Sequence, residues 1–297
     1  MSATYQAAAE QIADFLIKYN AIKKPIVLTG AGYSTASGIP DYRGINGLYR
    51  RNAAFKPIQY HQFISCPARR RTYWARSFLG WPALAAARPN TAHLALARLE
   101  QLAHIRGVIT QNVDALHRNH NLLELHGSLA AVSCMSCHHR TPRDAFQRLL
   151  AAMNPRWSAP GAASTLNPDG DADVPADAAF VYPDCIKCGG TYKPEVVFFG
   201  ENLPPERRRS ASEWVADASA LLCFGTSLTA YSAYRIVKEA TEGAIPVVIA
   251  NLGPTRADAL ADMRFDEKNE LLVPEVLRLL SGEDVSEEAL QRRFRED

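Results

Sequence analysis

Four of the six cysteines form two C-x-x-C pairs. They are Cys134 with Cys137 in CMSC and Cys185 with Cys188 in CIKC. In a chain without an export signal, such pairs indicate a zinc site rather than disulfides. The segment between the pairs is longer than the ~15–20 residues of an ordinary zinc ribbon, and His138 and His139 remain alternative ligands. Four thiolates leave no coordination position for water, so the expected zinc ion is structural.

A second set of candidate residues lies in GAGYSTASGIPDYRG at 30–44, directly after the apolar run PIVLT. Gly30 and Gly32 stand where a strand would turn into a helix, and there backbone N–H groups can approach a pyrophosphate. Thr35 occupies the third glycine position of the fingerprint G-x-G-x-x-G, which disfavours a dehydrogenase. A structural turn is the alternative, but the polar residues that follow favour a nucleotide-binding loop.

The segment TQNVDALH places Gln111, Asn112 and Asp114 after the apolar run at 105–110. In open α/β sheets, ligands bind at the carboxyl ends of the strands. Capping of a following helix would explain the same side chains. Because two strands of the predicted sheet end in polar segments, we favour a binding site.

His126, in LLELHGSL, is the strongest single candidate for proton transfer. Imidazole titrates near neutral pH, as a general base should, and the adjacent glycine lets a ligand approach closely. A structural role is the alternative for His126, and it is the role that we expect for His93 and His117.

Alternating strand and helix patterns must position these residues. Apolar runs predict buried strands in PIVLT and at 105–110, 220–225 and 245–250. Helical patterns are found at 3–19, 91–103, 205–219 and 231–242. This alternation predicts an α/β fold with a doubly wound parallel sheet.

Two segments interrupt the alternation, and we expect them to form a smaller lobe. Residues 45–90 are basic and aromatic, with short helices predicted around 59–64 and 67–79. Residues 127–194 carry both cysteine pairs, and the Pro-, Ala- and Asp-rich stretch 151–184 predicts a long surface loop. The sheet domain then consists of residues 1–44, 91–126 and 195–297.

Composition excludes several classes of partner. The chain has 297 residues, 47% hydrophobic and 22% charged, as in a globular protein. A net charge of +2 favours neither a nucleic acid nor an anionic membrane as partner. No apolar run approaches the roughly 18 residues that span a bilayer. The N-terminal segment has acidic residues and no arginine, so neither a signal nor a transit peptide is predicted and a cytoplasmic location is expected.

The motifs, in their order, resemble those of the sirtuins, the Sir2 family of NAD-dependent protein deacylases. Besides the segments above, they include KPEVVFFGE at 193–201, GTSL at 225–228 and NLGPT at 251–255. Tyr42 and the segments YWARSFLGWP, NPRWS, NPDGD and AYSAYR resemble class II, in particular the mitochondrial sirtuin-four branch. The expected absence of a transit peptide suggests a bacterial relative. After GTSL the commoner sirtuin pattern is V-x-P, whereas this chain has AYS at 230–232.

The resemblance implies a Rossmann-like domain and a small lobe made of a helical and a zinc module, with NAD as co-substrate between them. It also implies one structural zinc ion on the four cysteines. A substrate peptide is expected to add a strand along Val197, Phe198 and Phe199. The residues implied to contact NAD are Gly30, Ala31, Gly32, Ser34, Thr35, Pro40, Asp41, Tyr42, Arg43, Gln111, Asn112, Asp114, Gly225, Thr226, Ser227, Asn251, Leu252, Gly253 and Asn269.

The implied reaction removes an acyl group from a lysine of a protein substrate. The acyl oxygen attacks ribose C1′ as nicotinamide leaves, and His126 then acts as general base toward a ribose hydroxyl. The products are lysine, nicotinamide and O-acyl-ADP-ribose. Mono-ADP-ribosyl transfer at the same site and a non-catalytic, zinc-stapled NAD-binding module are the alternatives.

The resemblance leaves the acyl group open. Tyr73 and Arg76 have the Tyr-x-x-Arg spacing with which some class II relatives bind a succinyl or malonyl carboxylate. A solvated position on a helix is the alternative for Arg76. Trp74 and Trp81 make this segment more apolar, and the branch it resembles is linked to longer or branched acyls, lipoyl groups and ADP-ribosyl transfer. The stretch 151–184 is similar to a loop that reaches toward the active site in that branch.

Overall fold

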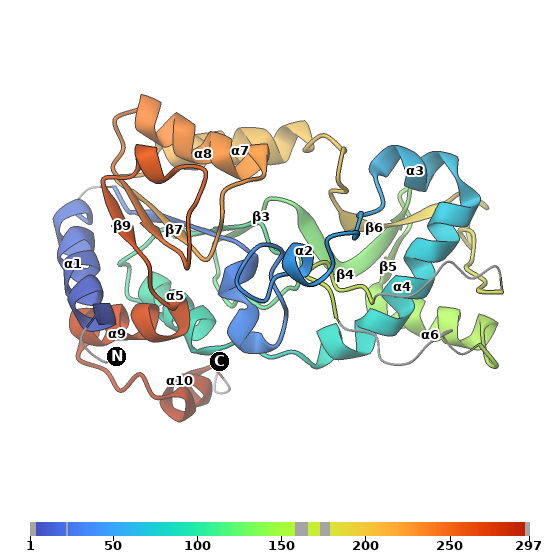
Figure 1. Cartoon of the computed structure of the whole chain (residues 1–297), viewed down its shortest axis with the longest axis horizontal. Helices are drawn as coiled ribbons and strands as arrows, with labels where there is room; N and C mark the ends of the chain where they lie inside the picture. Colours follow the sequence, from blue (N-terminus) through green and yellow to red (C-terminus); the bar gives the residue numbers. More distant parts are fainter. Residues whose placement is uncertain (1–3, 22, 158–165, 173–178, 295–297) are drawn as a thin grey trace.

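The computed structural model of the chain describes residues 4–21, 23–157, 166–172 and 179–294, which form a larger and a smaller lobe (Figure 1). Both chain ends lie beside the larger lobe. None of the helices in the described ranges is long and apolar enough to cross a membrane.

The larger lobe is built on a six-stranded parallel sheet with the order β3-β2-β1-β7-β8-β9. The strands are β1 (Ile26–Thr29), β2 (Gly107–Thr110), β3 (Leu122–Glu124), β7 (Leu221–Phe224), β8 (Val247–Ala250) and β9 (Met263–Phe265). The chain winds outwards from β1 on one side and from β7 on the other. This topology confirms the doubly wound fold, and ligands of such sheets bind where the winding reverses, here at the carboxyl ends of β1 and β7.

Helices cover both faces of the sheet (Figure 1). One face carries α1 (Thr4–Tyr19), α5 (Thr91–Gln101), α9 (Asn269–Ser281) and α10 (Glu287–Arg293), and the other carries α7 (Pro205–Ala216) and α8 (Tyr231–Glu242). Successive strand residues alternate between the two cores, since Val27 packs in the first and Leu28 in the second, both without exposed surface. Burial on both faces explains why these strands are continuous apolar runs.

The smaller lobe combines helices with a three-stranded antiparallel sheet of order β5-β4-β6. Aromatic rings fill its core, where Trp74 packs against Phe63 and Phe146. The short helix α2 (Leu48–Arg51) follows the glycine-rich loop. The other elements of this lobe are α3 (Tyr60–Ser65), α4 (Pro67–Ala86), β4 (Gly127–Cys134), β5 (Arg140–Pro142), α6 (Arg143–Met153) and β6 (Tyr192–Val196).

Two short strands and a longer helix were not expected. β3 and β9 each have three residues, all partly exposed, so neither shows the continuous apolar run of a buried strand. Helix α4 was predicted to end at residue 79 but continues to Ala86 with Pro82 inside it. Leu84, in the additional turn, is buried and packs with Leu129 of β4. This tertiary contact and the helix-favouring Ala and Leu residues of the turn outweigh the helix-breaking preference of Gly80 and Pro82.

The prediction that 151–184 is a surface loop is wrong for several of its described residues. The ring of Phe180 is fully buried, with its centroid 4.8 Å from that of Trp157 and 5.6 Å from that of Phe78. The buried Ala172 donates its N–H to the carbonyl of Arg76, 3.1 Å away. These side chains join the core of the smaller lobe, although the segment cannot form a core of its own. Residues 158–165 and 173–178 lie outside the described residues.

Candidate active site

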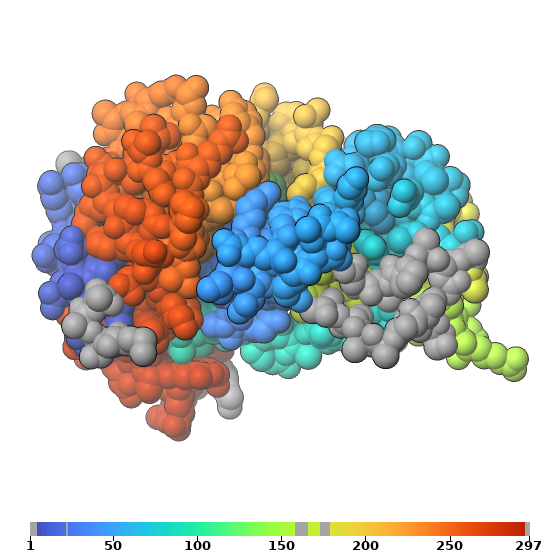
Figure 2. Space-filling model, in the orientation of Figure 1, coloured from blue at the N-terminus to red at the C-terminus, as the bar shows by residue number. Residues whose placement is uncertain are grey.

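A cavity of about 1800 Å³ lies between the two lobes. The loops that follow β1, β2, β7 and β8 line one side, and residues of the smaller lobe such as Tyr73 and Phe198 line the other. The segment after β1, in blue in Figure 2, lies across the face between α8 and the helices α3 and α4. The cavity therefore opens at the carboxyl edge of the parallel sheet, where the topology predicts a ligand site.

The glycine-rich loop after β1 packs directly on the loop after β7. The Gly32 N–H donates to the Gly225 carbonyl at 2.9 Å. A Cβ atom at Gly30 would lie 2.7 Å from Thr226 Cβ, and one at Gly32 would lie 2.9 Å from the Gly225 oxygen. Larger residues would force the two loops apart. This close approach forms a backbone-lined cradle that fits the pyrophosphate of a dinucleotide such as NAD.

The polar residues after β2 form hydrogen bonds to both loops of the cradle. Asn112 Nδ2 donates to the Gly30 carbonyl and to Ser34 Oγ, both at 3.0 Å. Gln111 Nε2 donates to Thr226 Oγ1 at 2.9 Å, and Ser34 Oγ donates to Asp114 at 2.7 Å. Burial raises the pKa of Asp114, and the Ser34 hydrogen bond opposes that shift. The two segments predicted from strand ends thus form one hydrogen-bonded network.

Most of the residues implied to contact NAD line the cavity. Gly30, Ser34 and Asp114 are not among the described lining residues and belong to the network behind it. At the far end, the Oδ1 atom of the buried Asn269 has no hydrogen-bond partner among the described residues. An acceptor oxygen in this position fits the amino group of an adenine. The lining members of the set are Ala31, Gly32, Thr35, Pro40, Asp41, Tyr42, Arg43, Gln111, Asn112, Gly225, Thr226, Ser227, Asn251, Leu252, Gly253 and Asn269.

His126 lines the same cavity between β3 and β4, and both of its ring nitrogens make hydrogen bonds. Nδ1 lies 3.0 Å from the Gln111 carbonyl oxygen, and Nε2 lies 2.8 Å from Ser232 Oγ. A carbonyl can only accept, so Nδ1 carries the proton and Nε2 presents its lone pair. Burial lowers the pKa of His126, the Gln111 hydrogen bond opposes this, and Arg207 adds to it. The imidazole is therefore held in the form of a base.

The segment predicted to pair with a substrate peptide follows β6 and lines the cavity at Val197, Phe198 and Phe199. The Val197 N–H donates to the His126 carbonyl at 2.8 Å, which connects the segment to the candidate base. The Phe199 carbonyl accepts the N–H of Tyr60, and the Phe198 N–H donates to Glu201. Peptide addition along this segment stays a prediction.

Tyr73 and Arg76 are placed differently, although both lie on α4. Tyr73 is buried and lines the cavity, whereas Arg76 is not among the described lining residues. The Arg76 guanidinium lies 5.9 Å from the centroid of the Phe55 ring, and its charge partly offsets the rise in the pKa of Asp171. The spacing alone could not show which way either side chain points.

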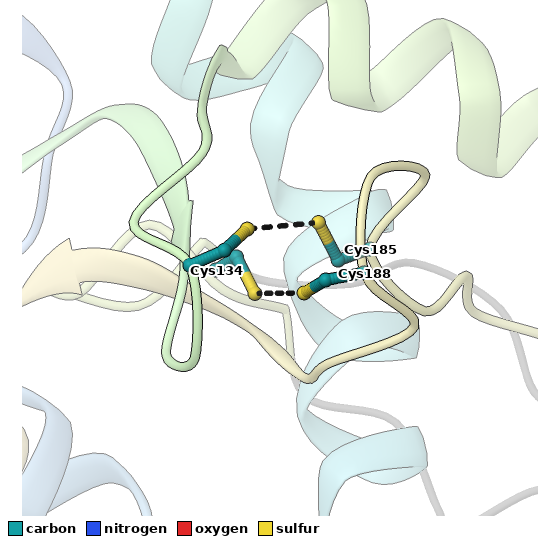
Figure 3. Close-up of side chains that lie close together, drawn as sticks. Cys134, Cys185 and Cys188 are labelled. Atoms are coloured by element: carbon teal, nitrogen blue, oxygen red, sulfur yellow. Dashed lines mark hydrogen bonds between the residues drawn. The ribbon is translucent and has the colours of Figure 1, made fainter.

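The four cysteines of the two pairs form one cluster, and Figure 3 shows the side chain of Cys134 facing those of Cys185 and Cys188. All four Sγ atoms lie within 4.8 Å of one another, with Cys134 3.5 Å from Cys188 and Cys137 3.7 Å from Cys185. Zn–S bonds of about 2.3 Å in a tetrahedron place the sulfurs about 3.8 Å apart. The cluster thus fits a structural zinc ion. Of the alternative ligands, His139 bonds instead to the Tyr192 hydroxyl at 3.0 Å.

Among the described cavity residues that were not predicted as site residues, three bear on its chemistry. Asp169 and Asp171 line it from the stretch taken for a surface loop, and Ser232 lines it from the first turn of α8. The segments NPDGD and AYSAYR signalled a subfamily, but neither pattern carries a chemical requirement that would identify a site residue.

Histidines 93 and 117 are buried behind the cavity, as expected of structural residues. His117 Nε2 lies 2.9 Å from Thr29 Oγ1, and the His93 and His117 ring centroids are 4.8 Å apart. Burial lowers the pKa of His93 and lowers that of His117 from 6.5 to about 4. Both rings are therefore neutral in the folded protein at neutral pH.

The buried His117 predicts a loss of stability in mild acid. Between pH 6.5 and 4 its imidazole holds fewer protons in the folded than in the unfolded chain, so the free energy of unfolding falls as the pH falls. For this one group the loss approaches about 3 kcal/mol. Urea unfolding at pH 7 and 4.5 should show a smaller decrease for His117→Gln than for the wild type. Equal decreases would contradict this assignment.

The Sir2 family model matches residues 30–232 of the chain. "NAD-dependent protein deacylase SIR4" of Batrachochytrium dendrobatidis is 48% identical over 280 residues, 89% of this chain and 91% of that protein. "NAD-dependent protein lipoamidase sirtuin-4, mitochondrial" of Homo sapiens is 43% identical over 85% of this chain and 81% of that protein. "NAD-dependent protein deacetylase 2" of Bradyrhizobium diazoefficiens is 44% identical over 89% of this chain and 95% of that protein.

Solved Sir2 structures share the two-lobed fold. "Structure of Sir2Tm bound to a propionylated peptide" matches with a TM-score of 0.69 and 28% identity, over 91% of this chain and all of that chain. "Sir2-p53 peptide-NAD+" matches with a TM-score of 0.67 and 27% identity, over 90% of this chain and 97% of that chain. In agreement with its glycine cradle, its half-buried cavity histidine and its four-cysteine cluster, the chain belongs to the Sir2 family.

Proposed function

We propose that His126 is the general base of the NAD-dependent protein deacylation that this Sir2 protein carries out. The observation that carries this assignment is the pair of contacts at the imidazole. Gln111 holds the proton on Nδ1, and the Nε2 lone pair, at the wall of the cavity, accepts the hydroxyl of Ser232. A base aimed at the site of a bound ribose can accept a hydroxyl proton there.

The other residues orient the reactants. When bound, NAD supplies an electrophilic ribose carbon as nicotinamide leaves. The cradle at Gly32 and Gly225 would hold its pyrophosphate, and Asn269 would contact its adenine. Phe198 and Tyr73, both of the smaller lobe, would line the part of the cavity that takes the acylated lysine. Enclosure of the reactants in the cavity between the two lobes would limit the access of water to the reacting groups.

Incubation of the protein with NAD and acylated peptides tests this assignment. We expect free lysine peptide, nicotinamide and O-acyl-ADP-ribose in equal amounts by mass spectrometry. Transfer of ADP-ribose onto protein without loss of acyl groups would favour the transferase alternative. NAD binding without release of nicotinamide would favour a non-catalytic module.

Two aspartates line the cavity from the stretch 151–184. Asp169 and Asp171 line it beside Tyr73, and the charge of Asp169 adds to burial in raising the pKa of Asp171. Negative charge on Asp169 repels a second carboxylate. We therefore propose that the enzyme prefers acyl chains without a terminal carboxylate, such as acetyl or lipoyl, to succinyl and glutaryl.

Replacement Asp169→Asn tests this acyl preference. Because it removes a like charge from the cavity wall, the ratio of succinyl to acetyl turnover should rise about tenfold. Turnover of acetyl, succinyl, glutaryl, methylglutaryl and lipoyl peptides measures the effect. Asp14→Asn, the same change on the exposed side of α1, is the control and should leave the ratio unaltered. A wild-type preference for succinyl would contradict the proposal.

A further inference from the structure

The hydroxyl of Ser232 makes the second contact of the candidate base, at 2.8 Å from His126 Nε2. Because the Gln111 carbonyl fixes the proton on Nδ1, Nε2 accepts this hydrogen bond and Ser232 donates it. Ser232 is half-buried and also lines the cavity. Its hydroxyl therefore lies between the imidazole and the part of the cavity expected to hold the ribose.

The position of Ser232 is set by rigid surroundings. It is the second residue of α8, whose first turn is closed by hydrogen bonds from the Ala233 and Tyr234 N–H groups to the Ala230 carbonyl. The preceding loop is tied down by the bond from the Leu228 N–H to Thr226 Oγ1. Ile236, one turn further along α8, has no exposed surface. The hydroxyl can rotate, but its oxygen stays in place.

Proton transfer changes what Nε2 needs from its neighbour. The single Nε2 lone pair already accepts the Ser232 O–H, so the ribose proton reaches Nε2 through this hydroxyl. The ribose O–H gives its proton to Ser232 Oγ as the Ser232 proton passes to Nε2, the electron pair stays on the ribose oxygen, and the imidazole becomes a cation with a new N–H. Nδ1–H still donates to Gln111, so the new N–H needs an acceptor of its own. Burial and the charge of Arg207 disfavour the cation, which makes this acceptor more important.

We propose that Ser232 relays the ribose proton to His126 and bonds to its imidazole in both protonation states. Its hydroxyl donates to the Nε2 lone pair before proton transfer, gives that proton to Nε2 as it takes the ribose proton, and accepts the new Nε2 N–H afterwards. A hydroxyl combines a donor with acceptor lone pairs and can make both bonds from one place. This inference rests on the proposed role of His126. It also gives a chemical role to AYS at 230–232, where the sequence departs from the commoner family pattern.

Substitutions at Ser232 separate this role from a structural one. Ser232→Ala should lower kcat for deacylation roughly tenfold, the effect of one hydrogen bond to a charged group, with the KM for NAD unchanged. Ser232→Thr keeps the hydroxyl and should restore most of kcat. Ser232→Cys keeps the size but offers only weak hydrogen bonding, so it should resemble the alanine variant.

Exchange of labelled nicotinamide into NAD, in the presence of acyl peptide, gives the second readout. Exchange needs only the departure of nicotinamide, which precedes the action of the base, so Ser232→Ala should leave it unaltered. Thr241→Val removes another α8 hydroxyl, one that bonds to the Val237 carbonyl away from His126, and should match the wild type in both assays. Equal loss of exchange and deacylation in Ser232→Ala would overturn the inference, as would a wild-type kcat.

The double variant His126→Ala/Ser232→Ala distinguishes the two proposals. If Ser232 acts through His126, its replacement should have no further effect once the imidazole is gone. An active His126→Ala enzyme would refute the proposed base. An inactive His126→Ala enzyme beside an unimpaired Ser232→Ala enzyme would refute only the role of Ser232.

Discussion

His126→Ala is expected to reduce deacylation by a factor of at least about 100, because positioned general bases contribute roughly 10²–10⁴-fold. NAD binding should persist, since the glycine cradle and the Asn112 network do not depend on the imidazole. Mass spectrometry of an acetylated peptide measures turnover, and calorimetric titration with NAD measures binding.

The matched control for this experiment is His120→Ala. His120 is exposed and its backbone N–H donates to Glu100, a bond that alanine keeps, so the variant should keep full activity. Near-normal deacylation by His126→Ala would remove the imidazole from the mechanism. Simultaneous loss of NAD binding would show instead that the substitution had disturbed the cavity.

Loss of a zinc ligand should have the second large effect, on folding of the smaller lobe. Cys185→Ser, or treatment with a strong chelator, is expected to abolish zinc binding and cooperative unfolding of this lobe. Structural zinc sites contribute apparent free energies of about 10–16 kcal/mol in zinc-finger peptides, more than the stability of most domains. Because the smaller lobe closes the cavity, deacylation should be lost as well. Elemental analysis and circular dichroism measure the two effects.

Cys66→Ser is the control for the zinc experiment, because Cys66 lies at the start of α4 and outside the four-cysteine cluster. It should retain one zinc ion per chain and the wild-type unfolding curve. A Cys185→Ser protein with unchanged zinc content would show that the cluster does not hold the metal. Unchanged stability after loss of zinc would show that the β4–β6 pairing holds the lobe together without it.

The hydrogen-bonding partners of the candidate base illustrate the boundary between sequence and tertiary structure. His126 could be selected from the sequence because its residue type and glycine neighbour suit proton transfer. Its tautomer could not, because the contacts come from Gln111, 15 residues away, and Ser232, 106 residues away. No local pattern encodes a partner at such a separation.

By itself the sequence determined the α/β class, the four main strands, the cysteine set and the strand-end residues of the site. These depend on local periodicity, on ligand type and spacing, and on the rule that strand ends carry the ligands. Only the tertiary structure decided that β3 and β9 complete the sheet and that Asp169, Asp171 and Ser232 face the cavity while Arg76 does not. The physical reason is that packing between distant segments sets which way a side chain points, and such packing outweighs weak local preferences.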